Sequence, residues 1–257
     1  QLLFPSRCFG CRKLGPTICS GCRSSWHPHY YRSKFDGLTV HSALIYTPTA
    51  SKIILAAKES GLKGACSLGL SFDADINNEN PDIVKKGEAR LIDALNVVEN
   101  LGGDYLGGVI FSALGKYKLP PTTKARDNAV AALKRLAITA QSKGITLGLE
   151  PVNRYESNLL NTGRQALDMI KDIGEPNVVV HLDIYHMNIE EQDLVSPVLE
   201  AGKQLGYVHI GASHRGPLGS GNIDFDSFFG ALAKIGYKGT ITFESFSSTV
   251  VSGDLSS

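Results

Sequence analysis

The chain has 257 residues, 42% of them hydrophobic, and a formal net charge of +1. This near-neutral balance gives no bulk attraction to nucleic acid or to an anionic membrane. No apolar run approaches the roughly 20 residues that cross a bilayer, and the first residues lack the pattern of a secretory signal. We therefore expect a globular, cytoplasmic protein, with nucleic-acid and membrane partners disfavoured.

A cysteine cluster stands near the start of the chain. It consists of two CxxC pairs made by four of the five cysteines, Cys8, Cys11, Cys19 and Cys22. Two such pairs can give four thiolates to one tetrahedral Zn²⁺, so residues 1–37 are predicted to form a zinc-ribbon-like segment. A redox pair or unliganded thiols are the alternative. Cys66 stands apart and is expected to be a small buried side chain.

The first quarter of the chain is similar to a known family. LFPSRCFGCRKLGPTICSGCR, followed by ALIYTPTASKIILAAKESG, resembles the N-terminus of ComF-type competence proteins over about residues 1–64. That resemblance implies a small zinc ribbon in front of a phosphoribosyltransferase domain. The chain has no acidic-pair–Thr-Gly run of the kind that holds a ribose phosphate, so this activity is not expected. Residues 38–63 are assigned to a connecting segment with a helix.

From about Gly64 onward, strand-like and helix-like segments alternate. The predicted strands are ACSLGLS, YLGGVIFS, ITLGLE, VVVHLD, YVHIG and TITFE. Apolar residues at helical spacing predict helices at 82–101, 123–143, 162–173, 193–204 and 225–235. Such alternation indicates an α/β fold with a parallel sheet. We predict a (β/α) TIM barrel over residues 64–257, incomplete, with about six of the eight strands of a full barrel.

Four of these strands end in a side chain that can bind a metal, Glu150, Asp183, His209 and Glu244. They are separated by 33, 26 and 35 residues, each about one strand–helix unit. The carboxyl ends of barrel strands converge on one mouth, so the four side chains can meet around one cation. This oxygen-rich set suits Mn²⁺, Mg²⁺ or Co²⁺ better than a structural Zn²⁺. The alternative is that each residue only caps its strand at the solvent edge.

The alternation of side chains within the strands favours the metal site. In ITLGLE, Leu147 and Leu149 share one face, and Glu150 lies on the other. The aliphatic set is predicted to face the covering helices and the polar set the barrel axis. By the same parity, Ile241 and Phe243 are expected to lie beneath helices.

The second part of the chain resembles the D-tagatose 3-epimerase and D-allulose (psicose) 3-epimerase group of the xylose-isomerase-like TIM-barrel superfamily. The runs that carry the resemblance, over about residues 64–250, are GLEPVNRYESNLLNT, HLDIYHMNIEE, GYVHIGASHRGPLGSGNIDFD and GTITFESF. It implies that the four strand-end residues hold a divalent metal, usually Mn²⁺. It also implies that Glu156, His186 and Arg215 contact the sugar, and that the protein forms a homodimer or homotetramer.

These residues fit the chemistry that the resemblance implies. Removing the C3 proton of a ketose gives an enediolate, and a divalent cation beside the C2 carbonyl stabilises the developing charge. Inversion at C3 requires one base on each face of the carbon, and Glu150 and Glu244 are the expected pair. For Glu156, a salt bridge with Arg154 is the alternative. His181 is expected to be a core histidine.

The favoured function is divalent-metal-dependent epimerisation of free ketoses at C3. One alternative is an aldose–ketose sugar isomerase on the same metal site. Another is a non-catalytic zinc-ribbon fusion with an inactive barrel remnant, because the barrel portion is shorter than the roughly 250 residues of a full barrel. A DNA-repair endonuclease of the same superfamily is less favoured, since a trinuclear zinc site needs more histidines.

Overall fold

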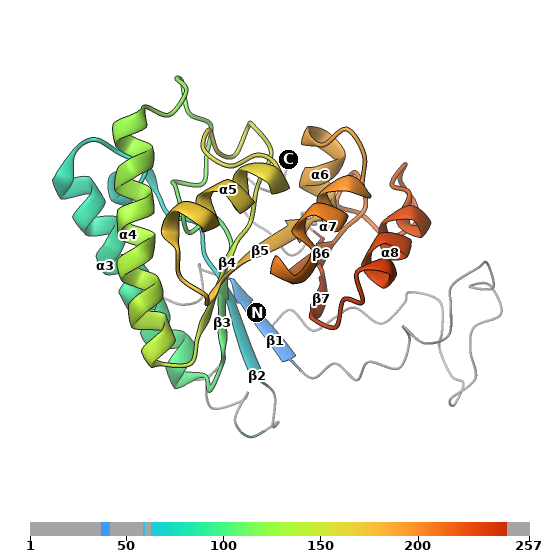
Figure 1. The fold of residues 1–257 in the computed structure, drawn as a ribbon, viewed down its shortest axis with the longest axis horizontal. Helices are drawn as coiled ribbons and strands as arrows, with labels where there is room; N and C mark the ends of the chain where they lie inside the picture. Colours follow the sequence, from blue (N-terminus) through green and yellow to red (C-terminus); the bar gives the residue numbers. More distant parts are fainter. Residues whose placement is uncertain (1–36, 42–58, 60–62, 246–257) are drawn as a thin grey trace.

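The computed structural model describes residues 37–41, 59 and 63–245. The predicted zinc-ribbon segment lies outside these residues, apart from Gly37, and so does most of the predicted connecting segment. In the described part, seven parallel strands form one sheet in which the strands follow chain order (Figure 1). The strands are β1 (Gly37–His41), β2 (Lys63–Ser67), β3 (Tyr105–Gly107), β4 (Thr146–Leu149), β5 (Val178–Asp183), β6 (Leu205–Ile210) and β7 (Thr240–Phe243).

Helices connect the strands and cover the outer face of the sheet (Figure 1). They are α3 (Pro81–Asn100), α4 (Thr123–Ser142), α5 (Gly163–Ile173), α6 (Ile184–Glu190), α7 (Ser196–Ala201) and α8 (Phe225–Lys234), with short 3₁₀ turns η1 (Phe72–Ala74) and η2 (Gly202–Gln204). The helices α3, α4, α5, α7 and α8 pack against one another in that order. This is the strand–helix arrangement of a (β/α) barrel, as predicted. Among the described helices, none combines the length and the apolar character needed to cross a bilayer.

The helix starts follow from the local sequence. Asn80, Thr122 and Thr162 each accept a hydrogen bond from a backbone N–H of the first turn of α3, α4 and α5. Such caps satisfy amide groups that lack a partner inside the helix. The predicted helices at 82–101, 123–143 and 162–173 are therefore confirmed to within a residue at each end.

Several predicted elements differ from those in the structure. The strand predicted at YLGGVIFS ends at Gly107, because Gly108 has a left-handed φ of 95° that turns the chain. The helix predicted at 193–204 is shorter: α7 begins at Ser196, with Pro197 in its first turn, and ends at Ala201, where Gly202 is the C-cap. Two elements were not predicted, the strand β1 and the helix α6.

The two faces of the sheet differ as the alternation predicts, with one exception. Leu147 and Leu149 are fully buried in the core beneath the helices. The prediction is wrong for Phe243, which is 44% exposed, and Ile241 is only partly buried. Both belong to β7, which pairs with β6 on one side and is the last strand of the described sheet.

Aromatic side chains on the inner face of the sheet form a layer below the strand ends. The rings of Tyr105 and Tyr207 stack with centroids 4.4 Å apart, and the ring of His181 lies 4.7 Å from that of Tyr207. Gly148 makes room for this layer, because a Cβ there would lie 1.7 Å from the Tyr105 hydroxyl oxygen. The layer is thus a close-packed floor for the residues above it.

Replacing Gly148 with alanine will therefore lower the free energy of unfolding by about 1–3 kcal/mol, because the Tyr105 ring or the strand has to move. Urea unfolding followed by circular dichroism measures this change. The matched control is Gly230→Ala in α8, where a Cβ has no neighbour within 4 Å. That variant should gain about 0.5–1 kcal/mol, since alanine favours the helix. Equal stability of the two variants would contradict the packing argument.

Candidate metal centre

The four side chains predicted from the strand ends come together at one edge of the sheet. One ligand atom from each of Glu150, Asp183, His209 and Glu244 lies within 4.8 Å of the other three. The register of β5 and β6 pairs Asp183 directly with His209. The two glutamates follow their strands: the amide of Glu150 donates to the carbonyl oxygen of Gly108, at 3.3 Å, and that of Glu244 to Ile210, at 2.9 Å.

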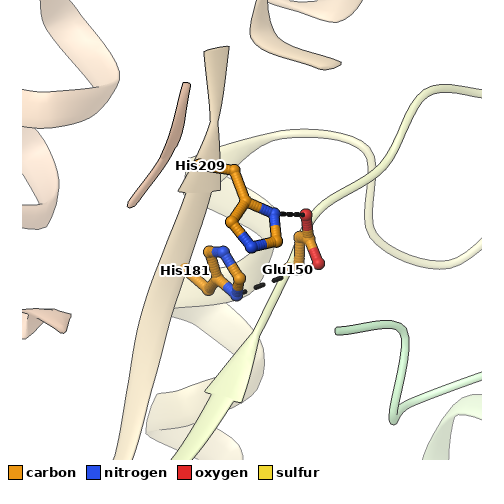
Figure 2. Close-up of side chains that lie close together, drawn as sticks. All are labelled: Glu150, His181 and His209. Carbon is orange, nitrogen blue, oxygen red and sulfur yellow. Dashed lines mark hydrogen bonds and ion pairs between the residues drawn. The ribbon is translucent and has the colours of Figure 1, made fainter. Parts of the chain in front are cut away.

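His209 lies at the centre of this cluster. Its Nδ1 is 3.0 Å from Oε1 of Glu150 and 3.9 Å from Oε2 of Glu244. On the inner side, Nδ1 of His181 is 3.8 Å from Oε2 of Glu150, and Figure 2 shows these three side chains pointing toward one another. Glu150, His181 and His209 form a second group whose ligand atoms lie within 4.8 Å. His181, which was expected to be a core histidine, is therefore buried, and it also borders the cluster.

Arg215 contacts two of the carboxylates. Its Nη1 is 2.9 Å from Oδ2 of Asp183 and 2.6 Å from Oε2 of Glu244. The guanidinium lies over the Tyr185 ring, 3.8 Å from the centroid. Its backbone has a φ of 59°, in a left-handed region that non-glycine residues rarely adopt. Arg215, predicted to contact a sugar, thus lies at the cluster and brings a positive charge to it.

His186 and Asp183 are joined by the start of α6. Asp183 caps this helix by accepting a hydrogen bond from the Tyr185 amide at 2.8 Å. The first turn then brings Nε2 of His186 to 3.6 Å from Oδ2 of Asp183. The unpredicted helix α6 is therefore what places His186 beside the cluster.

Asn153 links two residues that were predicted to contact a sugar. Its backbone amide donates to Nδ1 of His186 at 3.2 Å, and its side-chain nitrogen is 2.8 Å from Oε1 of Glu156. Glu156 does not pair with Arg154, the alternative that the sequence left open, because Arg154 makes an ion pair with Glu190 at 2.8 Å. Sequence reasoning missed Asn153, although a polar residue just after a strand end was a signal for it.

Charge interactions within the cluster shift the pKa values of its inner members. Burial alone would lower the pKa of His209, but the carboxylates of Glu150 and Glu244 outweigh it and raise that pKa to about 9. Burial also disfavours ionised Glu150, yet the adjacent His181 and His209 hold its pKa well below the usual range. Burial lowers the pKa of His181 to about 3.

The outer carboxylates respond in opposite directions. Burial raises the pKa of Glu244 to about 7, and the negative charges of Asp183 and Glu150 act in the same direction. Burial also disfavours ionised Asp183, but Arg215 and His186 lower the pKa of its carboxyl. Three carboxylates in one buried place repel one another, and a divalent cation would relieve that repulsion.

The residues present fit such a cation. The cluster offers three carboxylates and one imidazole, all buried except Glu244, which is partly buried. Oxygen-rich sets of this kind suit hard divalent cations. The described part of the chain therefore contains a candidate divalent-metal site at the carboxyl ends of β4 to β7.

Comparison with known proteins gives a family for most of the chain. Residues 33–255 match the family described as Xylose isomerase-like TIM barrel. The chain is 52% identical over 201 residues to a ketose 3-epimerase from Arthrobacter globiformis, covering 78% of this chain and 70% of that protein. It is 53% identical over 199 residues to an L-ribulose 3-epimerase from Methylomonas sp. (strain DH-1), covering 77% and 70%.

A solved structure has the same fold. The crystal structure of D-allulose 3-epimerase from Methylomonas sp. in complex with D-allulose superposes with a TM-score of 0.81 at 48% identity. The match covers 83% of this chain and 74% of that one.

The cluster predicts that Mn²⁺ stabilises the metal-free protein. A ligand that binds only the folded chain adds about 2.7 kcal/mol at a hundred times its dissociation constant, or about 5–10 °C in Tm for a chain of this size. Asp183→Asn should abolish the rise seen in a thermal melt. Asp172→Asn is the control, because that exposed carboxylate pairs with Arg126 away from the cluster and should leave the rise intact. A rise that persists in Asp183→Asn would contradict the assignment.

Proposed function

The chain belongs to the xylose isomerase-like TIM barrel family, and on this premise we propose that it catalyses the divalent-cation-dependent epimerisation of free ketoses at C3. It is an enzyme of the sugar isomerase and epimerase class, since relatives with more than half of their aligned residues identical are named ketose and L-ribulose 3-epimerases. The observation that carries the proposal is the approach of two glutamates from β4 and β7 to one imidazole, His209.

The two glutamates supply the acid–base chemistry. Epimerisation at C3 removes a proton from one face of the carbon and returns one to the other, so two proton-transferring groups are needed. Glu150 and Glu244 follow strands that are separated by β5 and β6 in the sheet, and both carboxylates approach Nδ1 of His209. One carboxylate takes the C3 proton to leave an enediolate, and the other, protonated, gives its proton to the opposite face. The roles exchange for the reverse reaction.

Two positive groups would stabilise the negative charge of the enediolate: a bound cation and the Arg215 guanidinium. Glu150, Asp183, His209 and Glu244 would hold the cation, which we propose to be Mn²⁺, with Mg²⁺ or Co²⁺ as substitutes. When bound, the cation supplies Lewis-acid polarisation of the C2 carbonyl. Arg215 adds a fixed positive charge, because its guanidinium is held by Tyr185 and by the carboxylates of Asp183 and Glu244.

Asn153 prepares the sugar-binding side of the site. A backbone amide can only donate, so Nδ1 of His186 accepts from Asn153, and Nε2 of the same ring lies 3.3 Å from Nη2 of Arg215. These contacts hold the His186 ring beside the cluster, on the side proposed to bind the sugar. The Glu156 carboxylate, oriented by the Asn153 side chain, presents an acceptor. The substrate of this proposal is an unphosphorylated ketose, like the D-allulose bound to the Methylomonas enzyme.

Replacing either Glu150 or Glu244 with glutamine will reduce kcat for ketose epimerisation by at least about a hundredfold, because an amide cannot accept the C3 proton. Turnover of a panel of free ketoses with Mn²⁺ measures this loss. Near-normal rates in one variant would exclude that residue as an acid or base.

The matched control is Glu200→Gln, an exposed carboxylate that pairs with Arg164 on the surface and should leave kcat unchanged. Turnover in heavy water separates the two sugar reactions. Deuterium at C3 supports epimerisation, whereas deuterium at C1 or C2 would replace it with aldose–ketose isomerisation.

Asn153→Ala will raise KM for the ketose more than it lowers kcat, because the proton-transferring glutamates stay in place while Glu156 and His186 lose a hydrogen-bond partner. A net hydrogen bond of about 0.5–1.5 kcal/mol corresponds to a change of about two- to tenfold. Steady-state kinetics measure the two constants. Asn100→Ala, at the exposed end of α3, is the control. An unchanged KM in Asn153→Ala would remove this role.

A further inference from the structure

His181 is a buried polar residue that the proposed reaction does not use. Its side chain is 1% exposed, and neither ring nitrogen has a hydrogen-bond partner in the described part of the chain. Leaving a buried polar group unpaired costs about 1–3 kcal/mol. A native structure usually explains such a group by an ordered water, an ion or a functional role.

The neighbours of His181 indicate what it can bind. Its Nδ1 is 3.8 Å from Oε2 of Glu150, and its ring meets that of His209 edge-on with centroids 4.2 Å apart. His181 lies two residues before Asp183 on β5, which is about 6.6 Å deeper along the strand. On the other side it is packed by the rings of Tyr105 and Tyr207.

We propose that Glu150, His181 and His209 form a second cation position, deeper than the four-residue cluster, that binds Zn²⁺. One carboxylate and two imidazoles are a donor set that proteins use for zinc with an open fourth position. Tetrahedral zinc with bonds near 2.1 Å separates its ligand atoms by about 3.4 Å. Nδ1 of His209 lies 3.0 Å from Oε1 of Glu150 and Nδ1 of His181 lies 3.8 Å from Oε2, one separation on either side of that value.

The two positions exclude each other. Both use Glu150 and His209, so one cation at a time can have its full ligand set. Imidazole nitrogen favours zinc, whereas the second and third carboxylates, Asp183 and Glu244, favour hard cations such as Mn²⁺. Zinc in the deeper position therefore displaces the hard cation and keeps Glu150 from acting as a base. The inference shares this cluster with the proposed function but does not depend on the reaction.

The test measures Zn²⁺ and Mn²⁺ binding separately. All arms use the full chain with Cys8, Cys11, Cys19 and Cys22 replaced by serine, so that the N-terminal thiols cannot bind zinc. Equilibrium dialysis with metal analysis gives each affinity in this background and in two further variants, His181→Phe and Glu244→Gln. X-ray absorption at the zinc edge counts the imidazole ligands of the bound ion.

Each of the two variants is expected to weaken the binding of one ion and not of the other. His181→Phe should weaken Zn²⁺ by about tenfold or more and leave the Mn²⁺ affinity unchanged, because losing a ligand costs at least as much as losing an outer partner. Glu244→Gln should weaken Mn²⁺ and leave the Zn²⁺ affinity unchanged. The zinc spectrum should show two imidazoles before the His181 substitution and one after it.

Three results would overturn the inference. Zn²⁺ binding that falls in Glu244→Gln but not in His181→Phe would put zinc in the four-residue cluster. Equal loss of both ions in His181→Phe would mean that His181 acts only through packing. A single imidazole on zinc in the serine background would exclude His181 as a ligand, and this result requires no His181 variant.

Further measurements separate the loss of metal binding from the loss of folding and from the loss of activity. Circular dichroism checks each variant, and His181→Leu replaces His181→Phe if the larger ring prevents folding. Zinc bound by two imidazoles in a chain that converts no ketose when it is freed of zinc and given Mn²⁺ would leave this inference standing and remove the proposed function. Ketose turnover with Mn²⁺ and no zinc bound through His181 would do the reverse.

Discussion

The site depends on bringing three carboxylates together in a buried place without unfolding the chain. Asp183 and Glu150 are almost fully buried, and Glu244 is close to both. Their repulsion is balanced by Arg215, which contacts two of them, and by His209, whose pKa of about 9 makes it a cation beside Glu150. Positive charge at the mouth, from side chains or from a bound metal, is therefore a condition for this arrangement and also the means by which it would stabilise an enediolate.

The rest of the structure supports this balance from below and from the side. Below it, the rings of Tyr105, His181 and Tyr207 are buried and packed together, and this apolar surrounding strengthens the charge interactions above it. At the side, the loop that carries Glu156 is fixed by the neighbouring strand–helix loop. The amide of Gly115 donates to the Glu156 carbonyl oxygen at 2.7 Å, and Asp75 holds the same neighbouring loop through the amide of Ala113 at 3.0 Å.

The position of His181 below Asp183 on β5 connects the fold to the proposed metal selectivity. Moving two residues down β5, from Asp183 to His181, exchanges a carboxylate for an imidazole while Glu150 and His209 stay within reach. A small shift in depth thus changes the donor set from oxygen-rich to nitrogen-rich. The activity proposed for the outer position and the zinc binding proposed for the inner one follow from the same two shared ligands.

The sequence by itself determined the parallel α/β fold and the four strand-end residues, because period-two alternation and regular spacing are local patterns that a parallel barrel turns into one convergent edge. It did not determine β1, α6, the exposed Phe243 or the roles of Asn153 and His181. Those depend on contacts between distant segments: a hydrogen bond from one loop to the first turn of another helix, and the packing of rings from β3, β5 and β6 across the barrel axis. Side-chain distances across the axis exist only once the strands are assembled, so only the tertiary structure decided which polar residues meet and which are left without a partner.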